Sequence, residues 1–155
     1  MNPAFAWAVA GLVLLLGSAV FRLGGRGIEV IAGGLTPVEW LALLLLTVVF
    51  VVGEGYFALA RKWVPRTLGR AAALRAEPRL LPRLLAPFHA MGLVFVPWRT
   101  ALRHWAGVVA IVAAVLIVRA FPDPWRGIVD FAVAAALAVG VIALLARAGR
   151  HPDPS

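Results

Sequence analysis

The residue in this sequence with the strongest claim to chemistry is Glu54, which lies near the end of a long apolar stretch. Gly53 and Gly55 flank it, and Tyr56 follows. An ionisable group inside a membrane helix is costly, faces protein or water, and is a candidate for function. A carboxylate there could serve a proton or cation path, and the glycines would let another backbone approach. The structural alternative is that its side chain reaches to the membrane interface, or pairs with Arg61 or with an arginine of the connector.

Two histidines and an arginine further along the chain complete a candidate polar cluster with Glu54 and Tyr56. His89 lies in a short apolar segment, whereas Arg99 and His104 lie at the start of a later and longer one. Histidines hold haem or a metal where helices bring them face to face. Neither histidine falls in the middle of a span, so we predict no metal and no cofactor.

Several catalytic classes lack their residues. Cysteine is absent, which removes disulfides, thiolate metal sites and a cysteine nucleophile. The motifs H-E-x-x-H and G-x-S-x-G and the phosphate-binding loop are also absent. The hydroxyls expected within spans, on Ser18 and Thr47, have no histidine nearby. The sequence therefore favours a protein that is not an enzyme. A lipid-acting enzyme at the cytoplasmic face, whose arginines grip phosphate, is the catalytic alternative.

The composition places the chain in a membrane. It has 155 residues, 63% of them hydrophobic, and a mean hydropathy of +0.94. Soluble domains are about 45–50% apolar, and a small domain buries only about two-thirds of the surface that its unfolded chain exposes. We predict an all-α integral membrane protein with a single membrane domain over residues 1–155.

Four segments are long and apolar enough to cross a bilayer as helices. They lie at about 3–21, 37–60, 101–121 and 127–146. The first lacks the basic start and the cleavage site of a signal peptide. Paired glycines predict a loop over 22–36. Thr36, Pro37 and Glu39 then suit the N-cap, the first turn and the positive end of the second helix.

A basic connector, residues 61–100, joins the second and third spans. We predict a short interfacial helix between Pro65 and Pro78, lying on anionic lipid. The segment Leu84–Trp98 is too short to span and is interrupted by prolines, which predicts an interfacial or re-entrant segment. A fifth, short span is the alternative. The basic side chains expected to contact lipid headgroups are Arg61, Lys62, Arg66 and Arg70.

The distribution of charge sets the orientation. With four spans, one side carries eleven Lys and Arg residues, and the other carries four: Arg22, Arg26, Arg119 and Arg126. The positive-inside rule then places the connector and both termini in the cytoplasm. The richness in Ala, Leu, Gly and Arg is typical of a bacterial protein, so we predict the inner membrane. Anionic lipid headgroups, not nucleic acid, are the expected counterpart of the net charge of +8.

Small residues predict how the helices pack, because lipid supplies no hydrophobic drive between them. Two stripes with four-residue spacing predict a hairpin between the third and fourth spans, or else contact with a second copy. The stripes are Ala106, Ala110 and Ala114 in one helix and Ala132, Ala136 and Gly140 in the other. At the outer turn, Arg126 and Asp130 are four residues apart and are expected to pair.

These observations favour a non-catalytic function for a small polytopic protein: a scaffold, an assembly factor or an accessory subunit of a membrane complex. Its expected partners are membrane lipids and either further copies of itself or the subunits of a larger complex. The main alternative is a small oligomeric transporter or channel in which Glu54 lines a proton or cation path.

Overall fold

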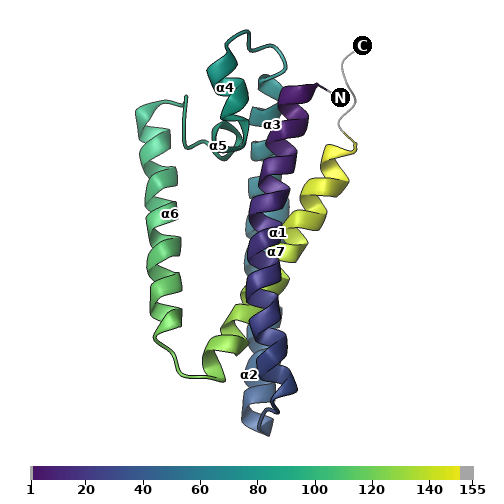
Figure 1. Ribbon diagram of the computed structural model, residues 1–155, viewed down its shortest axis with the longest axis vertical. Coiled ribbons are helices and arrows are strands. Elements are labelled where there is room, and N and C mark those ends of the chain that lie inside the picture. The colour runs from purple at the N-terminus through teal and green to yellow at the C-terminus, as the bar shows by residue number, and fades with distance from the viewer. Residues whose placement is uncertain (1, 151–155) are drawn as a thin grey trace.

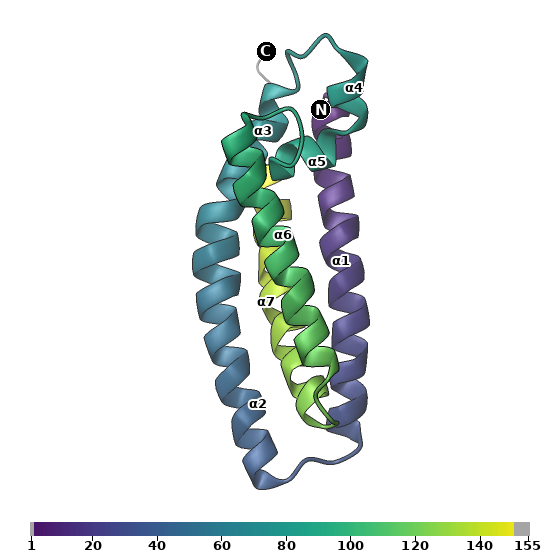
Figure 2. The same ribbon diagram turned by 90° about the vertical axis from the view of Figure 1, so that its left-hand side faces the viewer.

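The computed structural model describes residues 2–150, and every regular element in that range is a helix. Four helices are long and apolar enough to cross a membrane: α1 (Pro3–Ala32), the continuous helix Pro37–Ala73, α6 (Trp98–Arg119) and α7 (Trp125–Ala148). They confirm the predicted helical class and the four candidate spans. Figures 1 and 2 show all four running along the long axis of the molecule.

The first helix, α1, is longer than predicted. It runs unbroken for 30 residues to Ala32, so the loop predicted over 22–36 is wrong for most of its length. Gly27 does not end the helix, because its lack of a side chain is used for close packing against α7. A methyl group at Gly27 would lie 2.6 Å from Cβ of Phe131 in α7. The missing side chain therefore lets the two helices approach closely.

The second long helix begins where the sequence predicted. Its first part is α2 (Pro37–Phe50), and Pro37 occupies the first turn. The Thr36 hydroxyl accepts a hydrogen bond from the Glu39 N–H (3.4 Å), and the Glu39 carboxylate accepts one from the Thr36 N–H (2.8 Å). This reciprocal cap satisfies two backbone donors that would otherwise lack partners.

The same helix continues well beyond its predicted end at residue 60. α2 passes into the π-helix η1 (Val51–Trp63) and then into α3 (Val64–Ala73). Figure 2 shows α2 and α3 as parts of one rising helix. The prediction of a separate interfacial helix between Pro65 and Pro78 is therefore wrong. This segment extends the long helix and buries Val64 and Leu68 in the bundle.

The rest of the connector forms two very short helices, α4 (Leu80–Leu84) and α5 (Ala86–Met91). At about 1.5 Å per residue, neither comes near the thickness of a bilayer. No fifth candidate span occurs within residues 2–150. In Figure 1 the chain descends from α4 to α5 and rises again to the start of α6.

The hydrophobic core lies at the end of the molecule where α1 begins. Phe5 and Leu12 of α1 are buried together with Leu68 of α3 and Leu144 of α7. Small residues of α5 complete the cluster, and a methyl group at Gly11 of α1 would overlap the Pro87 ring. The start of α1 and the end of α7 therefore lie at the same end, as an even number of spans requires.

The helix α6 stands apart from the other three (Figure 1), and none of its residues is buried. The predicted hairpin between the third and fourth spans is therefore wrong: Ala106, Ala110 and Ala114 are all exposed. Part of the α7 stripe does mediate close packing, but the partner is η1. A methyl group at Gly140 would lie 3.0 Å from a methyl carbon of Leu59.

Candidate functional site

Glu54 lies on η1 at the middle of the bundle, beside the tightest approach of η1 to α7. Its neighbour Gly55 is buried, and a methyl group there would lie 3.0 Å from the carbonyl oxygen of Ala136. Ala136 is the midpoint of α7, the helix Trp125–Ala148. Measured along α7, Glu54 is therefore at mid-span, deeper than its place near the end of an apolar stretch indicated.

The backbone around Glu54 is π-helical over 13 residues. π-Helices are rare, and those that occur are mostly single turns that are frequent at functional sites. In η1 the buried positions Gly55 and Ala60 face inward, and Gly53, Glu54 and Tyr56 remain exposed. The π-helix thus places a carboxylate and a bare backbone position, Gly53, side by side on the outer surface.

The Glu54 carboxylate forms no hydrogen bond or ion pair with any residue in the described range 2–150. Arg61, one of the alternative partners, instead lies 5.9 Å from the ring centroids of Tyr56 and Phe57. Those two rings pack edge to face at 5.2 Å. An ionised side chain at the centre of a membrane helix costs about 2.5–3.5 kcal/mol on insertion scales. A partner or a ligand with a compensating charge would therefore stabilise the ionised Glu54 side chain at this position.

The structure separates the predicted polar cluster into two groups. Glu54 and Tyr56 lie on η1, whereas His89, Arg99 and His104 lie on α5 and at the start of α6. No hydrogen bond or ion pair among the described residues joins the two groups. Within the second group, the Arg99 guanidinium lies 5.8 Å from the Trp98 ring centroid.

The histidines bind the backbone of the connector. His104 Nδ1 lies 2.9 Å from the carbonyl oxygen of Gly92, and His89 Nδ1 lies 3.2 Å from that of Val94. Gly92 adopts φ +76°, a left-handed conformation that suits glycine. A methyl group there would also overlap the His104 ring. Both histidines thus help to fix the irregular segment between α5 and α6.

Two tryptophans, which sequence reasoning did not assign to the site, perform the same task. Trp7 of α1 donates its indole N–H to the carbonyl of Leu84 (2.9 Å), and Trp105 of α6 donates to that of Leu93 (3.2 Å). Tryptophan usually finds such a partner when its ring is packed. The sequence did contain a signal for this role: a tryptophan, which has an N–H donor, occurs at the same end of two of the predicted spans.

Of the four basic residues predicted to contact lipid headgroups, two contact other groups of the protein and two are free to reach lipid. Arg70 turns inward, and its Nη1 donates to the carbonyl of Ala90 (3.4 Å). Arg61 lies over aromatic rings, as described above. Lys62 and Arg66 are exposed, as contact with a headgroup requires.

A separate ion cluster lies toward the other end of the molecule. The Asp130 carboxylate is 3.9 Å from Arg26 of α1 and 4.0 Å from Arg126 of its own helix. Its side chain is only 10% exposed. The predicted Arg126–Asp130 pair is therefore present. Arg26 was missed as a partner because the sequence predicted a loop around it.

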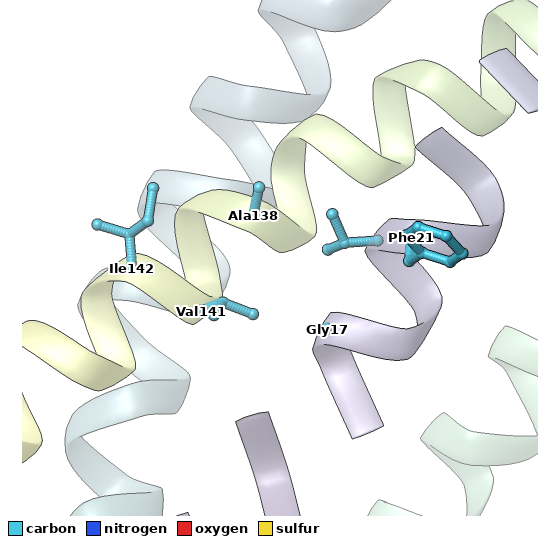
Figure 3. A pocket seen from close by; sticks show the side chains of 6 residues that line it. Gly17, Phe21, Ala138, Val141 and Ile142 are labelled. Atoms are coloured by element: carbon cyan, nitrogen blue, oxygen red, sulfur yellow. The ribbon is translucent and has the colours of Figure 1, made fainter. Parts of the chain in front are cut away.

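An open groove of about 360 Å³ lies between α1 and α7, and Figure 3 shows the residues that line it. Its walls are apolar: Gly17, Val20, Phe21, Ala138, Val141 and Ile142. No group of three or more potential metal ligands gathers within residues 2–150.

No family model, no curated protein and no solved structure matches the chain.

Proposed function

We propose that this protein is a non-catalytic subunit of a bacterial inner-membrane complex, and that α6 is its contact with the rest of the complex. The observation that supports the proposal is α6 itself. It is a 22-residue apolar helix without one buried residue, attached to its own chain mainly at its two ends. A helix that packs so little against its own bundle is available to pack against another protein.

The chemistry of the outer face of α6 supports this role. His104 and Trp105 reach back to the connector, so they mark the side of α6 that faces its own chain. At about 100° per residue, Ala106 and Ala110 lie on the opposite side. Small residues at four-residue spacing let helix backbones approach closely, which is how helices associate in lipid.

The connector would lie in the cytoplasm together with both termini, as the positive-inside rule favours. Lys62 and Arg66, which are exposed, would contact anionic headgroups. The descent of the chain into α5 and its return to α6 would form a shallow re-entrant segment (Figure 1). The carbonyls of Leu84, Ala90 and Leu93 accept hydrogen bonds from side chains, which helps to satisfy non-helical backbone in a membrane.

Enlarging one small residue of α6 tests this function. Ala110→Leu should weaken association at least about tenfold in nanodiscs prepared directly from the native membrane, because a bulky side chain prevents close helix packing. Val112→Leu, a smaller enlargement on the side of α6 that carries His104 and Trp105, is the control and should leave association unchanged. Quantitative crosslinking and size analysis of the nanodiscs give the result. A strictly monomeric wild-type protein without a bound subunit would overturn the proposal.

A second function, proton or cation transport by an oligomer, is favoured by the exposed mid-span position of Glu54. Transport requires that Glu54→Gln abolish ion flux in proteoliposomes while the protein remains folded. Glu29→Gln, an exposed carboxylate near the end of α1, is the control. Flux that persists in Glu54→Gln would exclude this carboxylate from the path.

A further inference from the structure

Arg22 is an exposed cation in the interior of the long helix α1, well before its end at Ala32. α1 and α7 run in opposite directions (Figure 2), and a methyl group at Gly24 would lie 3.7 Å from Cβ of Ala134. Arg22 precedes Gly24 by two residues, so it is level with the residue two positions after Ala134. That residue is Ala136, the midpoint of α7.

Glu54 of η1 lies at the same level, because its neighbour Gly55 contacts the backbone of Ala136. Figure 2 shows α7 between α1 and the helix that contains η1. The Arg22 guanidinium and the Glu54 carboxylate of one chain therefore belong to helices on different sides of α7. Both side chains are exposed, and neither forms an ion pair or hydrogen bond with any residue in the range 2–150.

A second copy of the chain brings the opposite charge to the correct level. Copies inserted side by side in the same orientation keep their levels, so α1 of one copy can place Arg22 against Glu54 on η1 of its neighbour. Two copies meeting through η1 alone would place Glu54 against Glu54, and like charges disfavour ionisation. Arg26 already lies 3.9 Å from Asp130 of its own chain. Charge complementarity therefore favours a contact between α1 and η1.

Both helices also have a bare glycine within one turn of the charge. A methyl group at Gly25 of α1 or at Gly53 of η1 would meet no neighbouring atom within 4 Å, and both glycines are exposed. Packing within one copy therefore uses neither of them. Small residues let helix backbones approach closely in lipid. A close approach at these glycines would bring the Arg22 guanidinium within reach of the Glu54 carboxylate.

We propose that copies of this protein associate through an ion pair between Arg22 of one copy and Glu54 of the next. The contact joins two different surfaces, α1 and η1, so it is heterologous and each copy can hold two neighbours. Each charge is costly alone in a membrane segment, and pairing offsets that cost. The inference goes beyond the proposed function, because it concerns surfaces away from α6 and names a second copy as their occupant.

Cysteine crosslinking between copies tests the contact, because the native chain has no cysteine. Gly25→Cys and Gly53→Cys copies with different affinity tags are produced together in one bacterial membrane and oxidised with copper phenanthroline. Disulfides should join the two kinds of copy. Ser18→Cys paired with Gly53→Cys is the matched control, because Ser18 is exposed on the same face of α1 about 10 Å away along the helix. It should crosslink at least about tenfold less, since a disulfide cannot span that offset.

Two results of that experiment would overturn the proposal. One is crosslinking of Gly25→Cys with Gly53→Cys that is no stronger than the Ser18→Cys control. The other is crosslinking mainly between two Gly53→Cys copies, because that would show η1 facing η1.

Charge variants identify the two side chains. Arg22→Gln and Glu54→Gln should each lower the crosslinking about tenfold, and Asp123→Asn, at an exposed carboxylate in the turn between α6 and α7, should not. Arg22→Glu combined with Glu54→Arg should restore it. A folded double variant that does not crosslink would contradict the ion pair. So would a loss in Arg22→Gln alone, because that would show Arg22 binding a lipid phosphate.

This proposal and the proposed function fail separately. Ala110→Leu changes α6 only, so the crosslink between α1 and η1 should persist in that variant. No crosslink, with a native complex that still depends on Ala110, would refute the ion pair alone. A crosslink that forms as expected, with a native complex insensitive to Ala110→Leu, would refute the role of α6 alone.

Discussion

Gly55 of η1 lies directly against the backbone of Ala136 in α7: a methyl group at position 55 would lie 3.0 Å from the Ala136 carbonyl oxygen. This contact fixes the depth of Glu54 and joins the second long helix to the last one. It also explains why glycine is needed on that side of the π-helix, whereas Gly53 next to it has open space.

Gly55→Leu should therefore destabilise the bundle, and Gly53→Leu should not. Overpacking a close contact costs about 1–3 kcal/mol, whereas a leucine at the open position meets only lipid. Thermal unfolding in mild detergent, followed by tryptophan fluorescence, measures the difference. Equal unfolding temperatures for the two variants would show that η1 and α7 are not in close contact.

The Asp130 cluster predicts a second stability effect. Asp130→Asn removes the carboxylate that lies near Arg26 and Arg126 and leaves two like charges together. A buried pair loses about 3–5 kcal/mol when one partner is removed, and surface pairs contribute about 0–1 kcal/mol. Arg26 is 44% exposed, so we expect an intermediate loss of about 1–3 kcal/mol.

Asp123→Asn is the matched control for that variant, because Asp123 is exposed in the turn between α6 and α7. Equilibrium unfolding in mixed micelles gives both free energies. If Asp123→Asn were as destabilising as Asp130→Asn, the ion cluster would not be the cause.

The connector predicts a local effect at Gly92. Gly92→Ala forces a side chain into a left-handed conformation and against His104, so the segment that joins α5 to α6 must shift. Trp105 donates to the carbonyl of the next residue, Leu93. Its fluorescence and the protease sensitivity of the connector should therefore both change. Gly69→Ala, at an exposed glycine with open space, should change neither.

Orientation has its own measurement. The native chain is free of cysteine, so single cysteines report their side without interference. A membrane-impermeant maleimide should label Asp123→Cys in intact spheroplasts, and Arg79→Cys only after permeabilisation. The reverse pattern would place the connector outside and contradict the positive-inside assignment.

The sequence predicted the features that depend on local spacing. The start of α2 follows from Thr36, Pro37 and Glu39, which act within four residues of one another. The Arg126–Asp130 pair follows from one helical turn. The four spans follow from apolar length alone.

The remaining features depend on contacts that no local pattern specifies. α1 continues past its glycines because Gly27 and Phe131, more than a hundred residues apart, are in contact. The partner of the α7 stripe is η1, although the nearest stripe in the sequence is on α6. The separation of Glu54 from the histidines also depends on long-range packing, because the path of the connector sets the distance between η1 and the α5–α6 region. Composition and spacing contain no information on that distance.

The pairing of α1 with α7 also has a consequence for synthesis. Among the described helices, α1 and α7 form the most extensive pair, although the helix Pro37–Ala73, the connector and α6 lie between them in the sequence. The bundle cannot close until the ribosome has released nearly the whole chain and α7 has entered the bilayer. Until then α1 and the helix Pro37–Ala73 lack their shared partner, so a truncated chain would expose Gly27 and Gly55 to lipid and to quality-control proteases.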